Sequence, residues 1–145
     1  MIDSNSPLTE DDVSRAEIEL GLQLPGDLRS FYLKHNGGRP ERRLFLRGDE
    51  GFLVEYFLPL VTESHKPGGS VISNFEIWQS VGASETLPQA IPIAFDSVGG
   101  NLLYSLDSKS RGAIFCTRSD SAPADRIRFL CPSLEEFLDG LQEWS

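Results

Sequence analysis

The apolar positions near the N-terminus recur at the spacing of an amphipathic helix. Val13, Ala16 and Leu20 fall on one helical face. Thr9, followed by three acidic residues, supplies a side-chain oxygen that can cap free backbone N–H groups at the start of such a helix. Gly21 suits the left-handed position that ends it. The pattern predicts a helix between Thr9 and Gly21, and then an extended connector over residues 22–25.

A second, shorter helix is predicted after residues 25–27, and it should stop at the sequence Asn36-Gly37-Gly38. Its buried face would hold Leu28, Phe31 and either Tyr32 or Leu33. From residue 44 the period changes, because residues 44–46 and 51–60 form aromatic and branched runs separated by a polar turn. These two runs predict a hairpin.

The middle of the chain predicts one more helix and then several strands. Residues 71–81 place Val71 or Ile72, Phe75 and Trp78 at helical spacing after a loop over residues 66–70. Residues 91–95, 102–106 and 113–117 then indicate three strands, and residues 127–130 a further extended piece. The connections over residues 97–101 and 107–112 are short, so neighbouring strands should be antiparallel.

The last helix is predicted from a capping box, in which Ser133 is followed three residues later by Glu136. Its apolar positions are Leu134, Phe137, Leu138, Leu141 and Trp144. The whole pattern predicts a single α+β domain over residues 1–145, with helices at both chain ends around a central, mostly antiparallel sheet that is covered on one face.

Composition and charge narrow the class of function. The chain has 145 residues, 39% of them hydrophobic, which argues against intrinsic disorder. Its net charge of -9 disfavours direct binding to nucleic acid or to an anionic membrane and favours a basic partner. Residues 1–30 are acidic, whereas four arginines cluster further on, at Arg39, Arg42, Arg43 and Arg47. Both features could also be an ordinary solvated surface.

A cytoplasmic location is expected, because the N-terminus lacks the basic and apolar regions of a signal peptide and no run is long enough to span a bilayer. Cys116 and Cys131 lack the spacing of a metal or redox motif and are expected to be buried small hydrophobes.

No catalytic constellation is evident, so the chain is not expected to be an enzyme, and no cofactor is expected. His35 and His65 are the only histidines; a pairing of His35 with Cys131 would need a spatial coincidence that nothing in the sequence supports. The spacing of Asp96, Asn101 and Asp107 fits no calcium loop, so no metal site is expected either.

The polar and glycine residues at the predicted turns and helix ends are expected first of all to have structural roles. Positive φ angles are expected at the turn glycines Gly37, Gly38, Gly99, Gly100 and Gly112. Hydrogen bonds to turn backbone are expected from Asn36, Asn101 and Asp107. The functional alternative is that Asp96, Asn101 and Asp107, at adjacent strand ends, present a polar rim to a partner.

The order of these pieces resembles the SUKH superfamily of bacterial toxin-immunity proteins, also called the Smi/Knr type after a yeast cell-wall regulator. Three blocks carry the resemblance: residues 16–38, residues 91–115 and the closing helix from Ser133. The residues of the first two blocks that match the family pattern are Glu17, Gly21, Leu24, Pro25, Asn36, Gly37, Gly38, Pro92, Gly99, Gly100 and Gly112.

The resemblance implies a cytoplasmic protein that binds and neutralises a cognate toxin, often a nuclease. A regulatory or scaffolding module that binds a cellular protein is the alternative. If an acidic surface meets a basic toxin, the candidate contacts are Asp96, Asn101, Asp107, Asp120 and Asp125. Trp78 could either cap the core or anchor a partner.

Overall fold

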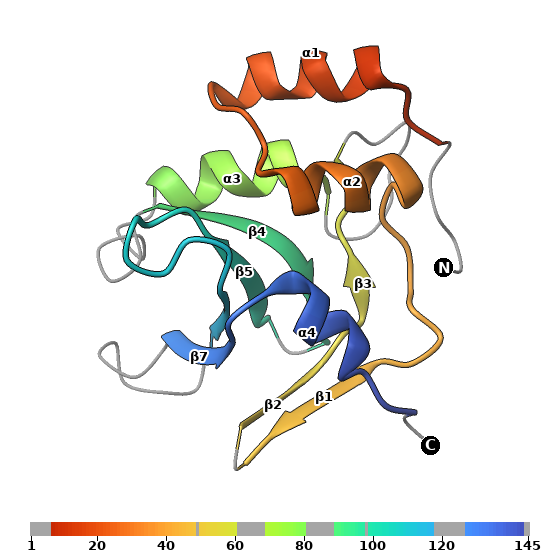
Figure 1. The fold of residues 1–145 in the computed structure, drawn as a ribbon, viewed down its shortest axis with the longest axis vertical. Coiled ribbons are helices and arrows are strands. Elements are labelled where there is room, and N and C mark those ends of the chain that lie inside the picture. Colours follow the sequence, from red (N-terminus) through yellow and green to blue (C-terminus); the bar gives the residue numbers. More distant parts are fainter. Residues whose placement is uncertain are drawn as a thin grey trace.

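The computed structural model describes residues 7–48, 50–60, 69–80, 89–97, 99–117 and 127–143. These ranges contain helices and strands in a mixed order, shown in Figure 1. In chain order they are α1 (Glu10–Leu20), α2 (Gly26–Lys34), β1 (Leu44–Arg47), β2 (Glu50–Leu53), β3 (Tyr56–Phe57), α3 (Val71–Ser80), β4 (Ala90–Phe95), β5 (Asn101–Ser105), β6 (Ile114–Thr117), β7 (Ile127–Cys131) and α4 (Leu134–Asp139). Among the described residues, no helix has the length and apolar character needed to cross a membrane.

The strands form two antiparallel sheets. The larger has the order β3-β4-β5-β6-β7, and the smaller is the hairpin of β1 and β2. The α+β class, the central antiparallel sheet and the predicted succession of β4, β5 and β6 are therefore confirmed. Figure 1 shows α2 and α4 lying over the five-stranded sheet, with the hairpin projecting below it.

The predicted strand over residues 51–60 is wrong in one respect, because it is two strands in two sheets. Val54 N–H donates to the Arg43 carbonyl at 2.8 Å and closes the hairpin. The next residue, Glu55, donates its N–H to the Phe95 carbonyl at 2.8 Å, which begins the pairing of β3 with β4. Between these two residues the chain leaves the small sheet and begins to pair with β4 of the large sheet. A run of apolar residues does not reveal where such a change occurs.

The five-stranded sheet is covered on both faces at its centre, not on one as predicted. Leu102 and Leu103 are neighbours in β5, so their side chains point to opposite faces, and both are 0% exposed. One face belongs to a large core that includes α1, α2 and α4. The other belongs to a smaller cluster in which Trp78 of α3 packs with Ala90 and Leu103.

Both terminal helices begin as predicted, but only α1 also ends as predicted. Thr9 and Asp12 form a reciprocal capping box at the start of α1, and Gly21 ends that helix with φ 76°. At α4, Ser133 Oγ accepts from Glu136 N–H at 3.1 Å. The predicted extension of α4 to Leu141 is wrong, because the helix stops at Asp139 and Gln142 forms an isolated bridge with Leu44 of β1. Trp144 lies outside the described residues.

Candidate protein-binding surface

The connector between α1 and α2 is held by one half-buried carboxylate, that of Glu17. Glu17 Oε2 accepts from the backbone N–H of Leu24 at 2.6 Å, and Glu17 Oε1 lies 3.7 Å from Nε of Arg29. Pro25 occupies the N-cap position of α2, with φ -55° and no side-chain capping bond. These contacts give Glu17, Leu24 and Pro25 a structural role, since they set the angle between the first two helices.

Asn36, Gly37 and Gly38 form a clasp between the end of α2 and residues 57–60. Asn36 Oδ1 accepts from the buried N–H of Leu60 at 2.9 Å. Gly38 exchanges two backbone hydrogen bonds with Phe57. A Cβ at Gly37 would lie 2.6 Å from the backbone nitrogen of Pro59, so the two chain segments approach as closely as they do only because residue 37 is glycine. This hydrogen bond reaches a residue 24 positions further along the chain, so the Asn36 side chain contacts a distant segment as well as standing at a turn.

The hairpin between β4 and β5 is closed by Asp96. Its Oδ1 accepts from Gly100 N–H at 2.7 Å, and its own N–H donates to the Gly100 carbonyl at 3.0 Å. Gly99 has the expected positive φ of 89°, as Gly112 does with 86° in the next connection. Gly100 is not among the glycines with positive φ, so that prediction is wrong; it is needed because a Cβ there would meet the Asp96 carboxylate at 2.5 Å.

The structure does not bring Asp96, Asn101 and Asp107 together as one rim. Phe95 and Asn101 are paired across β4 and β5, so Asp96 and Asn101 do share one end of the sheet. Asp107 follows the other end of β5, where Leu106 N–H donates to the Gln89 carbonyl. The error has a topological cause, because β5 runs antiparallel to β4 and separates its own two ends by the length of the strand.

The hydrogen bonds of Asp96, Asn101 and Asp107 stabilise turns and strand ends. Asp107 Oδ1 accepts from Lys109 N–H at 3.2 Å, which confirms the predicted turn bond. At Asn101 the backbone N–H, not the side chain, donates to Thr117 Oγ1 at 2.8 Å. Asp120 and Asp125 lie outside the described residues.

Trp78 is part of the core. It is only 6% exposed and packs against Ala90 and Leu103, with Phe115 and Ile127 partly buried beside it. Of the two roles that the sequence left open, the structure supports the cap of a hydrophobic cluster. A side chain buried to this degree cannot anchor a partner in this conformation.

Most of the arginine cluster is engaged within the fold. Glu55 Oε1 is paired with Nη2 of Arg39 at 2.5 Å, and Glu55 Oε2 with Nη2 of Arg43 at 2.8 Å. Arg47 donates to the Leu130 carbonyl at 2.8 Å, and Arg42 is exposed. Three of the four arginines of the basic cluster therefore form ion pairs or hydrogen bonds within the fold, around the hairpin, β3 and β7.

Most acidic side chains of α1 also make contacts within the fold. Arg29 of α2 is paired with Glu10, and it also reaches Glu17. Asp12 belongs to the N-terminal capping box, and its hydrogen bonds with the backbone and side chain of Thr9 lower the pKa of the Asp12 carboxyl. Asp11 and Glu19 are exposed.

A second acidic group, which the sequence interpretation missed, lies on and just after α4. All four of its members are exposed: Glu135, Glu136, Asp139 and Glu143. Within the described ranges, none of the four carboxylates takes part in an ion pair. Glu135 and Glu136 suit the positive end of a helix, but Asp139 in the last turn does not, so helix stability does not account for the whole group. Helical spacing could have revealed it, since these residues alternate with the apolar positions of the last helix.

The titratable residues considered for catalysis are embedded in packing. Burial lowers the pKa of His35, whose ring lies 5.7 Å from that of Phe31. Burial also raises the pKa of the Cys131 thiol to about 11, and its Sγ donates to the Ser133 carbonyl at 3.3 Å. A thiol that stays protonated at neutral pH is a weak nucleophile. Cys116 is buried and free, as is Cys131. His65 lies outside the described residues.

One further polar contact joins the helices to the sheet. The hydroxyl of Tyr104 in β5 donates to Asp27 Oδ1 at 2.5 Å, and the N–H of Leu28 donates to the same oxygen at 2.8 Å. Burial and this hydrogen bond raise the pKa of Tyr104 well above its usual range. The described residues contain no group of three metal-ligating side chains.

Comparison with known proteins identifies one family. The model of the SMI1 / KNR4 family (SUKH-1) matches residues 7–140. That match covers almost the whole chain, including the Glu17 connector, the clasp, the β4–β5 hairpin and α4. A search of curated proteins finds no match to the sequence.

Proposed function

Because the chain belongs to the SMI1 / KNR4 family (SUKH-1), we propose that it is an immunity protein that binds and neutralises a cognate toxin of a bacterial polymorphic or contact-dependent toxin system. The observation that carries this proposal is the family match over residues 7–140, since membership is consistent with toxin immunity in general. The protein would act in the cytoplasm by occupying the toxin and not by chemistry of its own. A basic nuclease domain is the first candidate for the partner.

The net charge of -9 supports a basic partner. Opposite charge accelerates diffusional encounter, and a fast encounter matters for an inhibitor that must reach a toxin before the toxin reaches its target. Affinity and specificity would then come from a few buried contacts at the centre of the interface.

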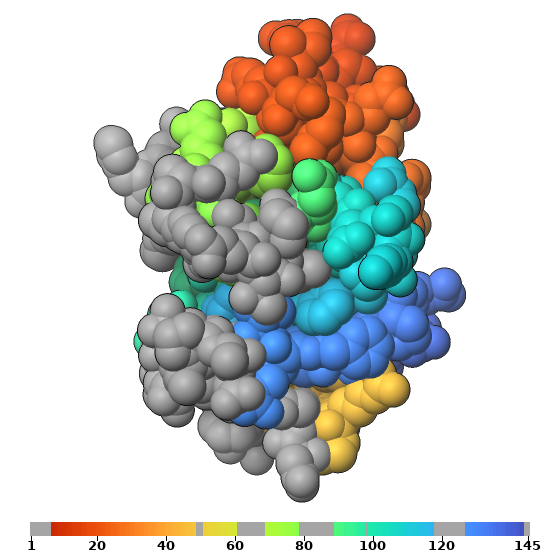
Figure 2. Space-filling model, turned by 90° about the vertical axis from the view of Figure 1, so that its left-hand side faces the viewer, coloured from red at the N-terminus to blue at the C-terminus, as the bar shows by residue number. Residues whose placement is uncertain are grey.

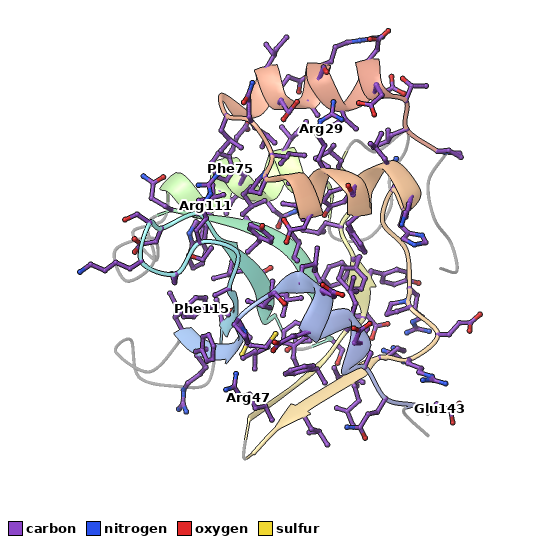
Figure 3. All side chains as sticks on the ribbon, viewed as in Figure 1. Arg29, Arg47, Phe75, Arg111, Phe115 and Glu143 are labelled. Atoms are coloured by element: carbon purple, nitrogen blue, oxygen red, sulfur yellow. The ribbon has the colours of Figure 1, made fainter. Side chains whose placement is uncertain are left out.

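The acidic group of α4 is the surface that best fits this role. Its carboxylates are exposed, and in the described part of the chain no basic residue neutralises them, whereas most acids of α1 already serve the fold. Figure 3 shows Glu143 directed away from the body of the molecule. Asp107 is a further candidate because its position after β5 is partly exposed. Asp96 is a weaker one, since its carboxylate closes its own hairpin.

The partner is identified by affinity capture of the tagged protein from its native host, followed by mass spectrometry. We expect recovery of a basic C-terminal fragment of a large secreted protein, and rescue of cells that express this fragment when the immunity protein is co-expressed. Reproducible capture of a housekeeping assembly without a toxin fragment would contradict immunity and favour a regulatory or scaffolding module. A toxin gene next to the gene for this chain would favour immunity.

The surface is tested separately by charge reversal. The variant Glu135→Lys, Asp139→Lys, Glu143→Lys is compared with the matched variant Asp11→Lys, Glu19→Lys, Glu76→Lys, in which three exposed acids elsewhere are reversed. We expect the α4 variant to slow association with the captured partner by about tenfold at low salt and the matched variant to slow it much less. Equal slowing by both variants would indicate a general field of the molecule, and no slowing by either would exclude α4 as the contact.

A further inference from the structure

The last strand of the large sheet has one edge without a partner strand among the described residues. β7 pairs with β6 on one side and ends the strand order. The register shifts between Phe129 and Cys131, so Leu130 has no Cα partner on β6. The edge of a sheet is a template on which another chain can add a strand, and bulges and charged side chains are common means of preventing this.

Arg47 lies against this edge. Its Nη1 donates to the Leu130 carbonyl at 2.8 Å, and its Cζ lies 4.9 Å from the centre of the Phe129 ring. Phe129 is 45% exposed, although its ring also contacts that of Phe115. Figure 3 shows Arg47 directed from the hairpin toward β7, and in Figure 2 the hairpin residues lie next to the segment of β7 and α4.

We propose that Arg47 is a guard residue that prevents the outer edge of β7 from associating with β7 of a second copy of this chain. The guanidinium takes a backbone acceptor that a new strand would need, and it places a charge where that strand would lie. The segment Ile127–Cys131 contains no proline or glycine and only one charged residue, so apart from its register shift its sequence does not oppose strand addition. Two identical edges can pair antiparallel about a twofold axis, which makes a second copy the natural occupant. This device belongs to the fold and does not depend on the proposed toxin partner.

The test compares three variants of the full chain by sedimentation over a range of concentrations. Arg47→Ala removes the guard, Arg42→Ala removes an exposed arginine of the same cluster, and Arg47→Lys keeps the charge but loses the planar group that stacks on Phe129. We expect Arg47→Ala to self-associate about tenfold or more tightly than the unmodified chain, Arg47→Lys to do so less, and Arg42→Ala to be unchanged. Circular dichroism verifies that each variant is folded.

Hydrogen exchange locates the new contact. In the Arg47→Ala variant, backbone amides of residues 127–131 should exchange more slowly at high concentration than at low concentration. The proposal is overturned if folded Arg47→Ala associates no more than the unmodified chain, if Arg42→Ala associates equally, or if the protection falls on another segment. If Arg47→Ala does not fold, the folded Arg47→Lys variant decides in the same way, and unchanged association of that variant overturns the proposal.

Discussion

Two joints of this molecule use the same residue types but hold the fold in different ways. At the clasp of residues 36–38, an amide side chain and two glycines connect α2 with a segment about twenty residues further along the chain. At the β4–β5 hairpin, the Asp96 carboxylate accepts its hydrogen bond from Gly100, four residues further on in the same turn. The comparison teaches that a polar residue followed by glycines marks a bend, whereas the fold decides whether that bend is local or carries a long-range contact.

The largest effect is expected from Gly37→Ala. The substitution places a Cβ against the backbone of Pro59, which cannot move aside, and it forces alanine to adopt a φ of 81°. We expect a loss of about 3 kcal/mol or more in the free energy of unfolding, measured by chemical denaturation. Gly21→Ala is the control, because its φ of 76° is similar but its Cβ would meet open space, and it should cost about 1–2 kcal/mol. Equal losses would show that the close approach at the clasp is unimportant.

The next effect is expected from Asn36→Ala. Its side chain is the acceptor for a buried N–H of Leu60, so the substitution leaves that donor without a partner. The free energy of unfolding should fall by about 1–3 kcal/mol, and the Leu60 amide should lose protection from hydrogen exchange. Asn101→Ala, at the start of β5, is the comparison and should change stability by less than about 0.5 kcal/mol. A larger loss at Asn101 than at Asn36 would reverse the distinction between the two joints.

A smaller effect is expected from Asp96→Ala, which removes the side-chain acceptor of the hairpin. The bond to Gly100 is local and partly solvent-accessible, so its loss should reduce the free energy of unfolding by about 1 kcal/mol. Asp96→Asn keeps an oxygen at the same position and should recover most of that stability in thermal unfolding. Identical losses for the two variants would mean that the negative charge, and not the hydrogen bond, matters at this position.

The smallest effect is expected from Gly100→Ala. The added Cβ would meet the Asp96 carboxylate at 2.5 Å, which can turn aside, and the backbone carbonyl of Thr117 at 3.0 Å, which has to give only slightly, so the loss should be about 0.5–1 kcal/mol. Because the two positions touch, the Asp96→Ala, Gly100→Ala double variant should lose less stability than the sum of the single variants. Additive losses in denaturant unfolding would show that the two residues act independently.

The parts of the fold that follow from local pattern were predictable. The cap at Thr9, the apolar face of α1 and the three successive strands β4, β5 and β6 all lie where residue spacing places them. Predictions failed where a distant segment intervened. α4 ends early where the ring of Phe45 packs against Gly140 and Gln142 bridges to β1, and the run over residues 51–60 divides between two sheets.

Only the sign of the charge on the candidate surface was predictable from the sequence. The acidic charge indicated a basic partner, but the individual residues did not follow from it. Trp78 proved to be core because it packs against Ala90 and Leu103 in the smaller cluster, and Asp107 was separated from Asp96 by the direction of β5. The acids of α4 were visible in the sequence, yet only the structure shows that no described basic residue neutralises them, while Glu10 and Glu17 of α1 are paired with Arg29.

The sequence by itself determined the family, the α+β class, the order of helices and strands, and the excess of negative charge. These follow from short-range information, because caps, turn residues and apolar periods act within a few positions of the chain. The tertiary structure alone decided that Asn36 reaches Leu60, that the centre of the sheet is buried on both faces, and that Arg47 donates to the Leu130 carbonyl of β7. Each of these depends on which distant segments meet, and that is settled by the joint packing of all elements and not by any one of them.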